Sequence, residues 1–256
     1  MIVRAMDLCR RAGAGSLIAV VLIAASLASA ASARAAWDCS KKTEHTLEST
    51  QPLNIGQLKF QLRDYYYCGA YQQEFAAKIA EAKAYLQQHA HDGPKPALVL
   101  DIDETSLSNW REIDQDDFGY ISGGDCTLQP GMACGAMAWE LSARAEALQP
   151  TLDLFNAAKS LGVAVFFITG RHDRSGLRAA TITNLEKAGY RGWTKLIMRP
   201  KTSSGSVTAY KTSERAKIQD QGYQIIANIG DQKSDLDDGS YAGKAFRLPN
   251  PFYSIP

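Results

Sequence analysis

The chain has 256 residues, of which 45% are hydrophobic, and its formal net charge is +1 at pH 7. This length accommodates one α/β domain with a sizeable core and is too short for two large domains. Because no block of lysine and arginine stands out, charge gives no reason to propose a nucleic-acid partner.

The N-terminus has the three-part layout of a secretory signal peptide. Arg4, Arg10 and Arg11 precede an apolar run from Ser16 to Ala30, and small residues follow. A transmembrane anchor is the alternative, but this run of about 15 residues is shorter than the ~20 that span a bilayer. We therefore expect a cleaved signal peptide over residues 1–35, an exported protein that is periplasmic or secreted, and no stable membrane anchor.

Four cysteines remain after the leader, namely Cys39, Cys68, Cys126 and Cys134. An even number of cysteines in an exported chain indicates disulfides, and four cysteines allow three pairings. We favour Cys39–Cys68 and Cys126–Cys134, of which the second closes a short loop. A zinc site is the competing interpretation, but the expected C-x₂-C spacing is missing.

The rest of the chain alternates apolar runs with amphipathic segments, after an irregular stretch over Trp37–Tyr71. The predicted helices are Gln72–His89, a piece near Met137–Leu148, Thr151–Leu161, Asp173–Ala188 and Thr212–Gln221. The predicted strands are Ala97–Leu100, Val163–Ile168, Leu196–Met198, Tyr223–Ile229 and Ala245–Leu248. This alternation predicts an α/β fold, a parallel sheet with helices on both faces. We expect a single domain over residues 36–256, with a small cap or loop insertion at about 107–149.

Three predicted strands end in residues suited to phosphate chemistry. They are Asp101-Ile102-Asp103-Glu104-Thr105 after the first, Thr169-Gly170-Arg171 after the second, and Gly230-Asp231-Gln232-Lys233-Ser234-Asp235 after the fourth. Lys211 opens the helix that leads into the fourth strand. Because ligands bind beyond the carboxyl ends of parallel strands, we expect these side chains to converge.

The convergence would create a site for a metal and a phosphate. Asp101, Asp103 and Asp231 would repel one another, and Mg²⁺ resolves that conflict because it binds carboxylates, carbonyls and waters. Asp101 can then act as a nucleophile, while Mg²⁺, Lys211, Thr169 and backbone N–H groups hold the phosphoryl oxygens. Asp103 can protonate the leaving alcohol and later deprotonate the attacking water.

Each motif alone also has an ordinary explanation. An Asp-x-Asp-Glu run can cap a helix, the Thr-Gly and Gly-Asp pairs can be turns, and Lys211 can be a surface lysine. Lys201 competes with Lys211 for the phosphate, but it lies in a Ser/Thr/Gly-rich loop. Arg171 can clamp a phosphate or form a structural ion pair. The aromatic residues of the insertion either line the substrate mouth or pack the cap, and they are Trp110, Phe118, Tyr120 and Trp139.

Together the motifs resemble those of the haloacid dehalogenase superfamily of phosphatases. Within it, the chain resembles the acid phosphatases grouped with plant vegetative storage proteins and bacterial class B-type enzymes. The matching stretches are Asp101–Asn109, Phe167–Arg171, Tyr210–Arg215, Gly222-Tyr223, Asn228–Leu236 and Arg247–Pro251. The resemblance implies a Rossmann-like fold, Mg²⁺ dependence, and acid phosphatase activity on small phosphomonoesters through a phospho-aspartate.

By motif position, the resemblance also implies a role for each site residue. Asp101 would be nucleophile and metal ligand, and Asp103 would be the acid/base and a ligand through its backbone carbonyl. The phosphate would be bound by Thr169, Gly170 and Lys211. Asp231 would be the third protein ligand of the metal, and Asp235 a supporting acid beside it.

Two other functions fit parts of this pattern. A phosphate-binding or storage protein on the same fold would keep the site and turn over negligibly, although storage proteins that lack the nucleophile differ from this chain, which has Asp101. A receiver-type phospho-acceptor fits an Asp/Thr/Lys set, but export and the presence of Asp103 argue against it. Glycine-rich nucleotide-binding loops are absent, and no feature sets an oligomeric state.

Overall fold

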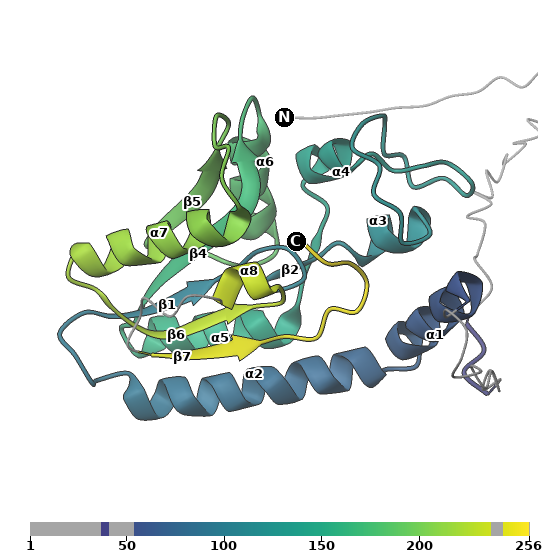
Figure 1. Cartoon of the computed structure of the whole chain (residues 1–256). Coiled ribbons are helices and arrows are strands. Elements are labelled where there is room, and N and C mark those ends of the chain that lie inside the picture. The colour runs from purple at the N-terminus through teal and green to yellow at the C-terminus, as the bar shows by residue number, and fades with distance from the viewer. Residues whose placement is uncertain (1–36, 41–53, 237–242, 256) are drawn as a thin grey trace, which may run out of the picture. The chain divides into compact units, whose positions relative to one another are not determined.

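A parallel sheet of five strands organises the protein (Figure 1). The computed structural model describes residues 37–40, 54–236 and 243–255. The strands of the sheet are β1 (Pro96–Leu100), β4 (Ala164–Asp173), β5 (Lys195–Pro200), β6 (Gln224–Gly230) and β7 (Lys244–Arg247). They lie in the order β5-β4-β1-β6-β7, and all neighbouring pairs are parallel. The predicted parallel sheet is therefore confirmed.

Helices lie along the sheet and beyond its edge. They are α1 (Ile55–Tyr67), α2 (Ala70–His89), α3 (Trp110–Gln115), α4 (Ala136–Ser142), α5 (Gln149–Ser160), α6 (Leu177–Lys187), α7 (Val207–Asp220) and α8 (Lys233–Leu236). A separate antiparallel pair consists of β2 (Leu107–Ser108) and β3 (Glu146–Ala147). Among the described helices, none has both the length and the apolar character needed to cross a membrane. The expected signal peptide, residues 1–35, lies outside the described residues.

The sheet is covered on both faces, as the unbroken apolar strands predict. In β1, Leu98 and Leu100 join one core with residues of α2, α5 and α6, whereas Ala97 and Val99 join another with residues of α7. Successive side chains of a strand point to opposite faces, so a strand buried on both faces needs apolar residues throughout. Figure 1 shows α7 on one side of the sheet and α2 with α5 on the other.

The order of the strands reverses at β1, which creates a crevice at its carboxyl end. From β1 the chain builds outward to β4 and β5, then returns to the other side of β1 for β6 and β7. β1 and β6 are paired up to Leu100 and Ile229. Asp101 and Asp231 therefore leave neighbouring strands at the same edge, which is where ligands bind in open α/β sheets.

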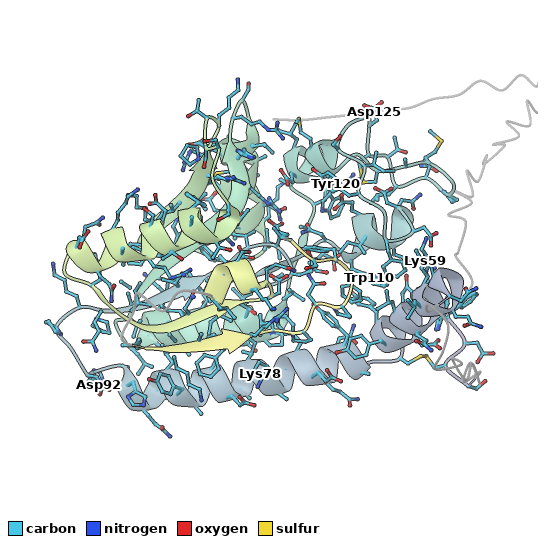
Figure 2. All side chains as sticks on the ribbon, in the orientation of Figure 1. Lys59, Lys78, Asp92, Trp110, Tyr120 and Asp125 are labelled. Atoms are coloured by element: carbon cyan, nitrogen blue, oxygen red, sulfur yellow. A yellow bond between two sulfur atoms is a disulfide. The ribbon has the colours of Figure 1, made fainter. Side chains whose placement is uncertain are left out.

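Helix α1 corrects the prediction that Trp37–Tyr71 is irregular. The side chain of Asn54 caps its first turn by accepting a hydrogen bond from the backbone N–H of Gln57 at 3.2 Å. None of its residues is fully buried, so the sequence lacks the apolar stripe by which a helix is recognised. The helix is held by aromatic packing instead, because Tyr66 stacks on Trp110 with 3.7 Å between ring centroids (Trp110 is labelled in Figure 2).

The cap segment, residues 107–149, contains α3, α4, β2, β3 and the first residue of α5. The predicted helix Met137–Leu148 is too long, since α4 ends earlier and β3 follows. Asn184 of α6 explains the end of the helix. Its Nδ2 donates to the carbonyl of Ala145 at 2.6 Å, and its Oδ1 accepts from the N–H of Ala145 at 3.1 Å. The Asn184 side chain thus satisfies the N–H and the carbonyl of Ala145, which would bond within the helix if α4 continued.

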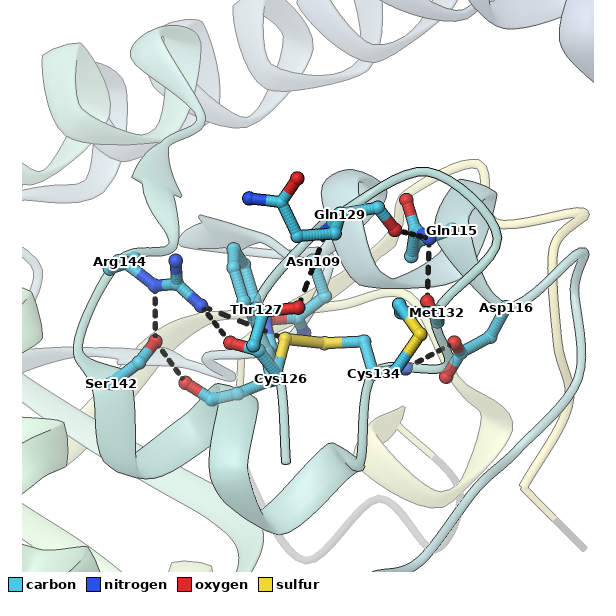
Figure 3. Close-up of a disulfide and its surroundings, with 11 residues drawn as sticks. Asn109, Gln115, Asp116, Cys126, Thr127, Gln129, Met132, Cys134, Ser142 and Arg144 are labelled. Carbon is cyan, nitrogen blue, oxygen red and sulfur yellow. Dashed lines mark hydrogen bonds between the residues drawn. A yellow bond between two sulfur atoms is a disulfide. The ribbon is translucent and has the colours of Figure 1, made fainter. Parts of the chain in front are cut away.

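Both expected disulfides are present, and one of them shapes the cap segment. The Cα atoms are 5.7 Å apart in Cys39–Cys68 and 4.0 Å apart in Cys126–Cys134. Figure 3 shows the loop closed by the second disulfide resting on its neighbours. Gln115 of α3 donates to two carbonyls of this loop, at 2.6 and 2.8 Å, and Arg144 donates to the carbonyl of Cys126 at 2.8 Å. The disulfide loop is therefore fixed on both sides.

Candidate active site

Three carboxylates from separate parts of the chain converge between the ends of β1 and β6. Asp101 follows β1, Asp231 follows β6 and Asp235 lies in α8. One oxygen of each lies within 4.8 Å of the others, and all three side chains are buried. Of the predicted trio Asp101, Asp103 and Asp231, the structure brings together Asp101 and Asp231, and Asp235, expected as a supporting acid, takes the third place. Such an oxygen-only set of donors fits a hard divalent cation.

Lys211 reaches the same cluster from α7. Its Nζ lies 2.5 Å from Asp101 Oδ1 and also donates to Asp235 Oδ1. The lysine is buried, with 4% of its surface exposed. A buried ammonium in contact with two carboxylates is a charge partner, which excludes the ordinary interpretation of Lys211 as a surface lysine.

The start of α7 differs from the prediction. The helix begins at Val207, and the side chain of Ser206 caps it by accepting from the N–H of Ala209 at 3.1 Å. Lys211 therefore lies one turn inside the helix and does not open it. The cap was hidden because Ser206 stands in a run of serines and threonines that resembles a loop. The competing residue, Lys201, is exposed and does not line the site among the residues described.

Charge is not balanced within this cluster. Burial raises the pKa of Asp101 well above its usual range; Lys211 opposes the rise, and Asp235 and Asp231 add to it. Burial and Asp235 raise the pKa of Asp231 to about 6, although Asn250 Nδ2 donates to it at 2.7 Å. Three carboxylates thus share one lysine, and a bound divalent cation would lower both pKa values.

The carboxylate of Asp103 is not one of the three converging groups and instead pairs with Arg171. Arg171 Nη2 lies 2.6 Å from Asp103 Oδ1, and its Nε lies 3.0 and 3.1 Å from the two oxygens. Asn109 Nδ2 donates to the same carboxylate at 2.8 Å. Burial acts to raise the pKa of Asp103, but Arg171 and these hydrogen bonds bring it below its usual value. Of the two interpretations of Arg171, the ion pair is the one present.

Thr169 and Gly170 lie inside β4, because this strand continues beyond its predicted end to Asp173. The pairing of β4 with β5 shifts register after Thr169, which marks a β-bulge. Thr169 is buried, and its Oγ1 accepts from the N–H of Arg171 at 3.1 Å, whereas Gly170 lines the cavity. Because β4 extends to Asp173, α6 begins at Leu177 and not at the predicted Asp173.

A buried hydrogen-bond network behind Asp103 was not predicted from the sequence. Glu104 accepts from the N–H of Asn109 at 2.5 Å, from its Nδ2 at 3.0 Å and from the hydroxyl of Tyr253 at 2.9 Å. Trp139 Nε1 donates to Asn109 Oδ1 at 2.8 Å. Burial, with Asp103, raises the pKa of Glu104 to about 8. Glu104 and Asn109 lie in the acidic stretch after β1, which is a usable signal, but Trp139 and Tyr253 meet them only through the fold.

These residues border a cavity of about 510 Å³ that reaches from the carboxylate cluster to the cap segment. Phe118, Tyr120 and Trp139 line it, as one of the two interpretations of the cap aromatics requires. Trp110 follows the other interpretation, since it packs on α1. A cavity of this size that is lined by charged and aromatic side chains suits a small molecule.

Comparison with known proteins agrees with this geometry. Acid phosphatase 1 of Solanum lycopersicum is 32% identical to the chain over 76% of the chain and 73% of that protein. Vegetative storage protein 1 of Arabidopsis thaliana is 32% identical over 62% of the chain and 55% of that protein. The class C acid phosphatase of Bacillus anthracis has the same fold, with a TM-score of 0.59 and 23% identity over 78% of this chain and 86% of that one. Residues 23–256 match the model of the HAD superfamily, subfamily IIIB (Acid phosphatase), and the chain belongs to this family of acid phosphatases.

Proposed function

We propose that the protein is an exported, Mg²⁺-dependent acid phosphatase that hydrolyses small phosphomonoesters through a phospho-aspartate on Asp101. One observation carries the proposal. Asp101, Asp231 and Asp235 converge within 4.8 Å, and Lys211 contacts Asp101, at the base of a cavity. This arrangement supplies a nucleophile, a cation site and a fixed positive charge at one point, as phosphoryl transfer requires.

In the first step, an oxygen of Asp101 attacks the phosphorus, and the bond between phosphorus and the leaving oxygen breaks. Arg171 holds the pKa of Asp103 low in the free protein, so Asp103 must take up a proton once the negative phosphate lies beside it. It gives this proton to the leaving oxygen, and the product leaves as a neutral alcohol. Lys211 and the backbone N–H of Gly170 stabilise the phosphoryl oxygens, and the buried Thr169, whose Oγ1 accepts from the Arg171 N–H, supports the backbone around Gly170. When bound, Mg²⁺ neutralises charge on the carboxylates and the phosphoryl group.

In the second step, a water attacks the phosphorus of the phospho-aspartate. Asp103, now ionised, accepts a proton from this water, and the bond between phosphorus and the Asp101 oxygen breaks. Inorganic phosphate leaves, and both carboxyl groups return to their starting states. The ion pair with Arg171 fixes the position of Asp103 for both proton transfers.

The residues fit Mg²⁺ by the chemistry of their donors. Asp101, Asp231 and Asp235 offer only oxygen, and they are buried with too little positive charge to balance them. The backbone carbonyl of Asp103 would complete the protein's share of ligands. Export is supported by the signal-like N-terminus and by the two disulfides, which persist in oxidising compartments.

A storage protein without turnover is the alternative, and its support is the similarity to vegetative storage protein 1 of Arabidopsis thaliana. The two functions differ in what happens after phosphate binds. An enzyme releases phosphate repeatedly, whereas a storage protein binds phosphate or its analogues and stops.

Release of phosphate from p-nitrophenyl phosphate with Mg²⁺ tests the proposal. We expect turnover that is abolished by EDTA, restored by Mg²⁺ and lost in Asp101→Asn. Asp125→Asn, an exposed residue of the cap segment, is the matched control and should keep wild-type activity. Beryllofluoride with Mg²⁺ should also raise the Tm of the wild type and not of Asp101→Asn. Turnover by a correctly folded Asp101→Asn protein would refute the nucleophile, and absence of turnover in the wild type over a broad panel of phosphomonoesters would favour storage.

A further inference from the structure

The cavity continues from the phosphate-binding end to a wall formed by the cap segment. We call this wall the leaving-group wall, and its residues are Glu112, Phe118, Tyr120, Trp139 and Glu140. Because Asp101 lines the same cavity outside this wall, an alcohol attached to the reacting phosphate would reach these side chains. Its side chains therefore determine which alcohols the cavity accepts.

Glu112 of α3 and Glu140 of α4 are half-buried in this wall, and their carboxyl groups have no hydrogen-bond or ion-pair partner among the residues described. Glu104, in the same cavity, accepts three hydrogen bonds. Burial, with Asp103, raises the pKa of Glu112 to about 8. Burial also raises the pKa of Glu140 to about 7, against the opposing charge of Arg171. Two carboxyl groups in a cavity without partners are favourable sites for a ligand that brings positive charge.

The other charges of the cavity do not satisfy these two groups. Its lining, among the residues described, includes seven aspartates and glutamates but only three lysines and arginines. Lys211 and Arg171 already pair with the carboxylates of Asp101 and Asp103, and Arg174 is exposed and makes no ion pair with Glu140. A divalent cation and a doubly charged phosphate would cancel each other. When Glu112 and Glu140 are ionised, their negative charge therefore remains at the wall and disfavours acidic alcohols.

An exposed aromatic ring lines the same cavity as these carboxylates. Tyr120 is 81% exposed and makes no ring contact among the residues described, and Figure 2 labels it among the loops of the cap segment. The other two rings of the wall already make cation–π contacts. The guanidinium carbon of Arg63 lies 5.0 Å from the centroid of the Phe118 ring, and that of Arg144 lies 5.5 Å from the centroid of the Trp139 ring. An aromatic face next to carboxylates is the usual surroundings of a bound ammonium group.

We propose that the leaving-group wall selects phosphomonoesters of amino or quaternary ammonium alcohols. Glu112 and Glu140 face the positive charge of the alcohol, and Tyr120 covers it. This inference rests on the proposed function, since it names the substrate class of the same site. A neutral polyol, which would use the two carboxylates only as hydrogen-bond acceptors, is the competing occupant.

Two substrates of the same shape separate charge from size. Phosphocholine and 3,3-dimethylbutyl phosphate differ in that a quaternary nitrogen replaces a carbon, and p-nitrophenyl phosphate reports whether the enzyme works at all. With Mg²⁺ present, we expect kcat/KM of the wild type to favour phosphocholine by about tenfold. Glu112→Gln and Glu140→Gln should each reduce this ratio to about a third or less, and the double variant should bring it near one. Glu146→Gln, an exposed residue of β3, should leave the ratio unchanged.

The outcomes distinguish the two proposals. Turnover of p-nitrophenyl phosphate with a wild-type ratio near one would overturn the substrate class and leave the phosphatase intact. A stronger preference for a ribonucleoside monophosphate that is lost in Glu112→Gln would also overturn it, in favour of hydroxyl recognition. Failure of the wild type on all three substrates would count against the proposed function itself. Turnover of p-nitrophenyl phosphate by the glutamine variants shows that they are folded.

Discussion

Lys211 Nζ lies 2.5 Å from Asp101 Oδ1, although 110 residues separate the two side chains in the sequence. Both are buried, and the lysine also contacts Asp235. A buried carboxylate stays ionised only beside positive charge, so Lys211 helps keep the proposed nucleophile reactive. The same ammonium is placed to stabilise the charge of a phosphoryl group on Asp101.

Replacement of this lysine by an uncharged side chain of similar length tests both roles. In Lys211→Met we expect kcat for p-nitrophenyl phosphate to fall by about 100-fold or more, because the positive charge beside Asp101 and the phosphoryl group is lost. Lys201→Met is the matched control, since Lys201 is exposed and outside the cavity, and it should keep wild-type kcat. Steady-state kinetics at saturating Mg²⁺ measures both. A Lys211→Met enzyme within a few-fold of the wild type would exclude Lys211 from the reaction.

The sheet and the acidic cluster are predictable from sequence because their signals are local. β1 and β6 are unbroken apolar runs, and each is followed at once by an aspartate, Asp101 or Asp231. Parallel pairing then brings these aspartates together without further information. The cysteine count indicates disulfides but leaves three pairings open, and the fold selects Cys39–Cys68 and Cys126–Cys134.

The parts that were not predictable depend on contacts between distant residues. Helix α1 has no fully buried residue and depends on an Asn54 cap and on Tyr66 stacking with Trp110. The pairing of Arg171 with Asp103 spans 68 residues, and Arg171 lies at the bulge in β4. No periodicity or motif encodes such contacts, so sequence reasoning leaves Arg171 with two interpretations that only the fold separates.

Gly230, the last residue of β6, leaves no room for a side chain beside Asp235. A Cβ at this position would lie 2.3 Å from Asp235 Cβ, which forces one of them to move. We expect Gly230→Ala to lower the free energy of unfolding by about 1–3 kcal/mol through overpacking, and to reduce activity because Asp235 is displaced. Urea unfolding and phosphate release measure the two effects. Gly205→Ala, where no atom lies within 4 Å of the added Cβ, should change neither; wild-type stability and activity in Gly230→Ala would contradict the packing argument.

The two disulfides should differ in what they stabilise. Loop-closure entropy predicts a loss of about 2–3 kcal/mol for Cys126→Ala/Cys134→Ala and about 3–4 kcal/mol for Cys39→Ala/Cys68→Ala, because the bridges span 8 and 29 residues. The Cys126–Cys134 disulfide also holds the loop that rests on α3 and lies near α4, and these two helices carry Glu112 and Glu140. Its removal should therefore raise KM, whereas removal of Cys39–Cys68 should leave KM unchanged. Chemical unfolding and steady-state kinetics on both double variants test this, and equal KM effects would show that the loop does not shape the cavity.

Stability of the metal-free protein should fall as pH rises from 5 to 8, and the leaving-group wall should contribute to that fall. The pKa values of Glu112 and Glu140 are raised to about 8 and about 7, mainly by burial, with Asp103 adding to both and Arg171 opposing. Asp116 also raises the pKa of Glu112, and Arg174 lowers the pKa of Glu140. In this pH range the folded protein binds more protons than the unfolded chain, whose glutamates titrate at about 4.3, so deprotonation favours unfolding.

Urea unfolding in EDTA at pH 5 and pH 8 measures how steeply the free energy of unfolding falls with pH. The double variant Glu112→Gln/Glu140→Gln should show a shallower decline than the wild type, and Glu186→Gln, at an exposed position of α6, is the control. An equal decline in the double variant and the wild type would mean that the two carboxyl groups are solvated and that the cap does not bury them.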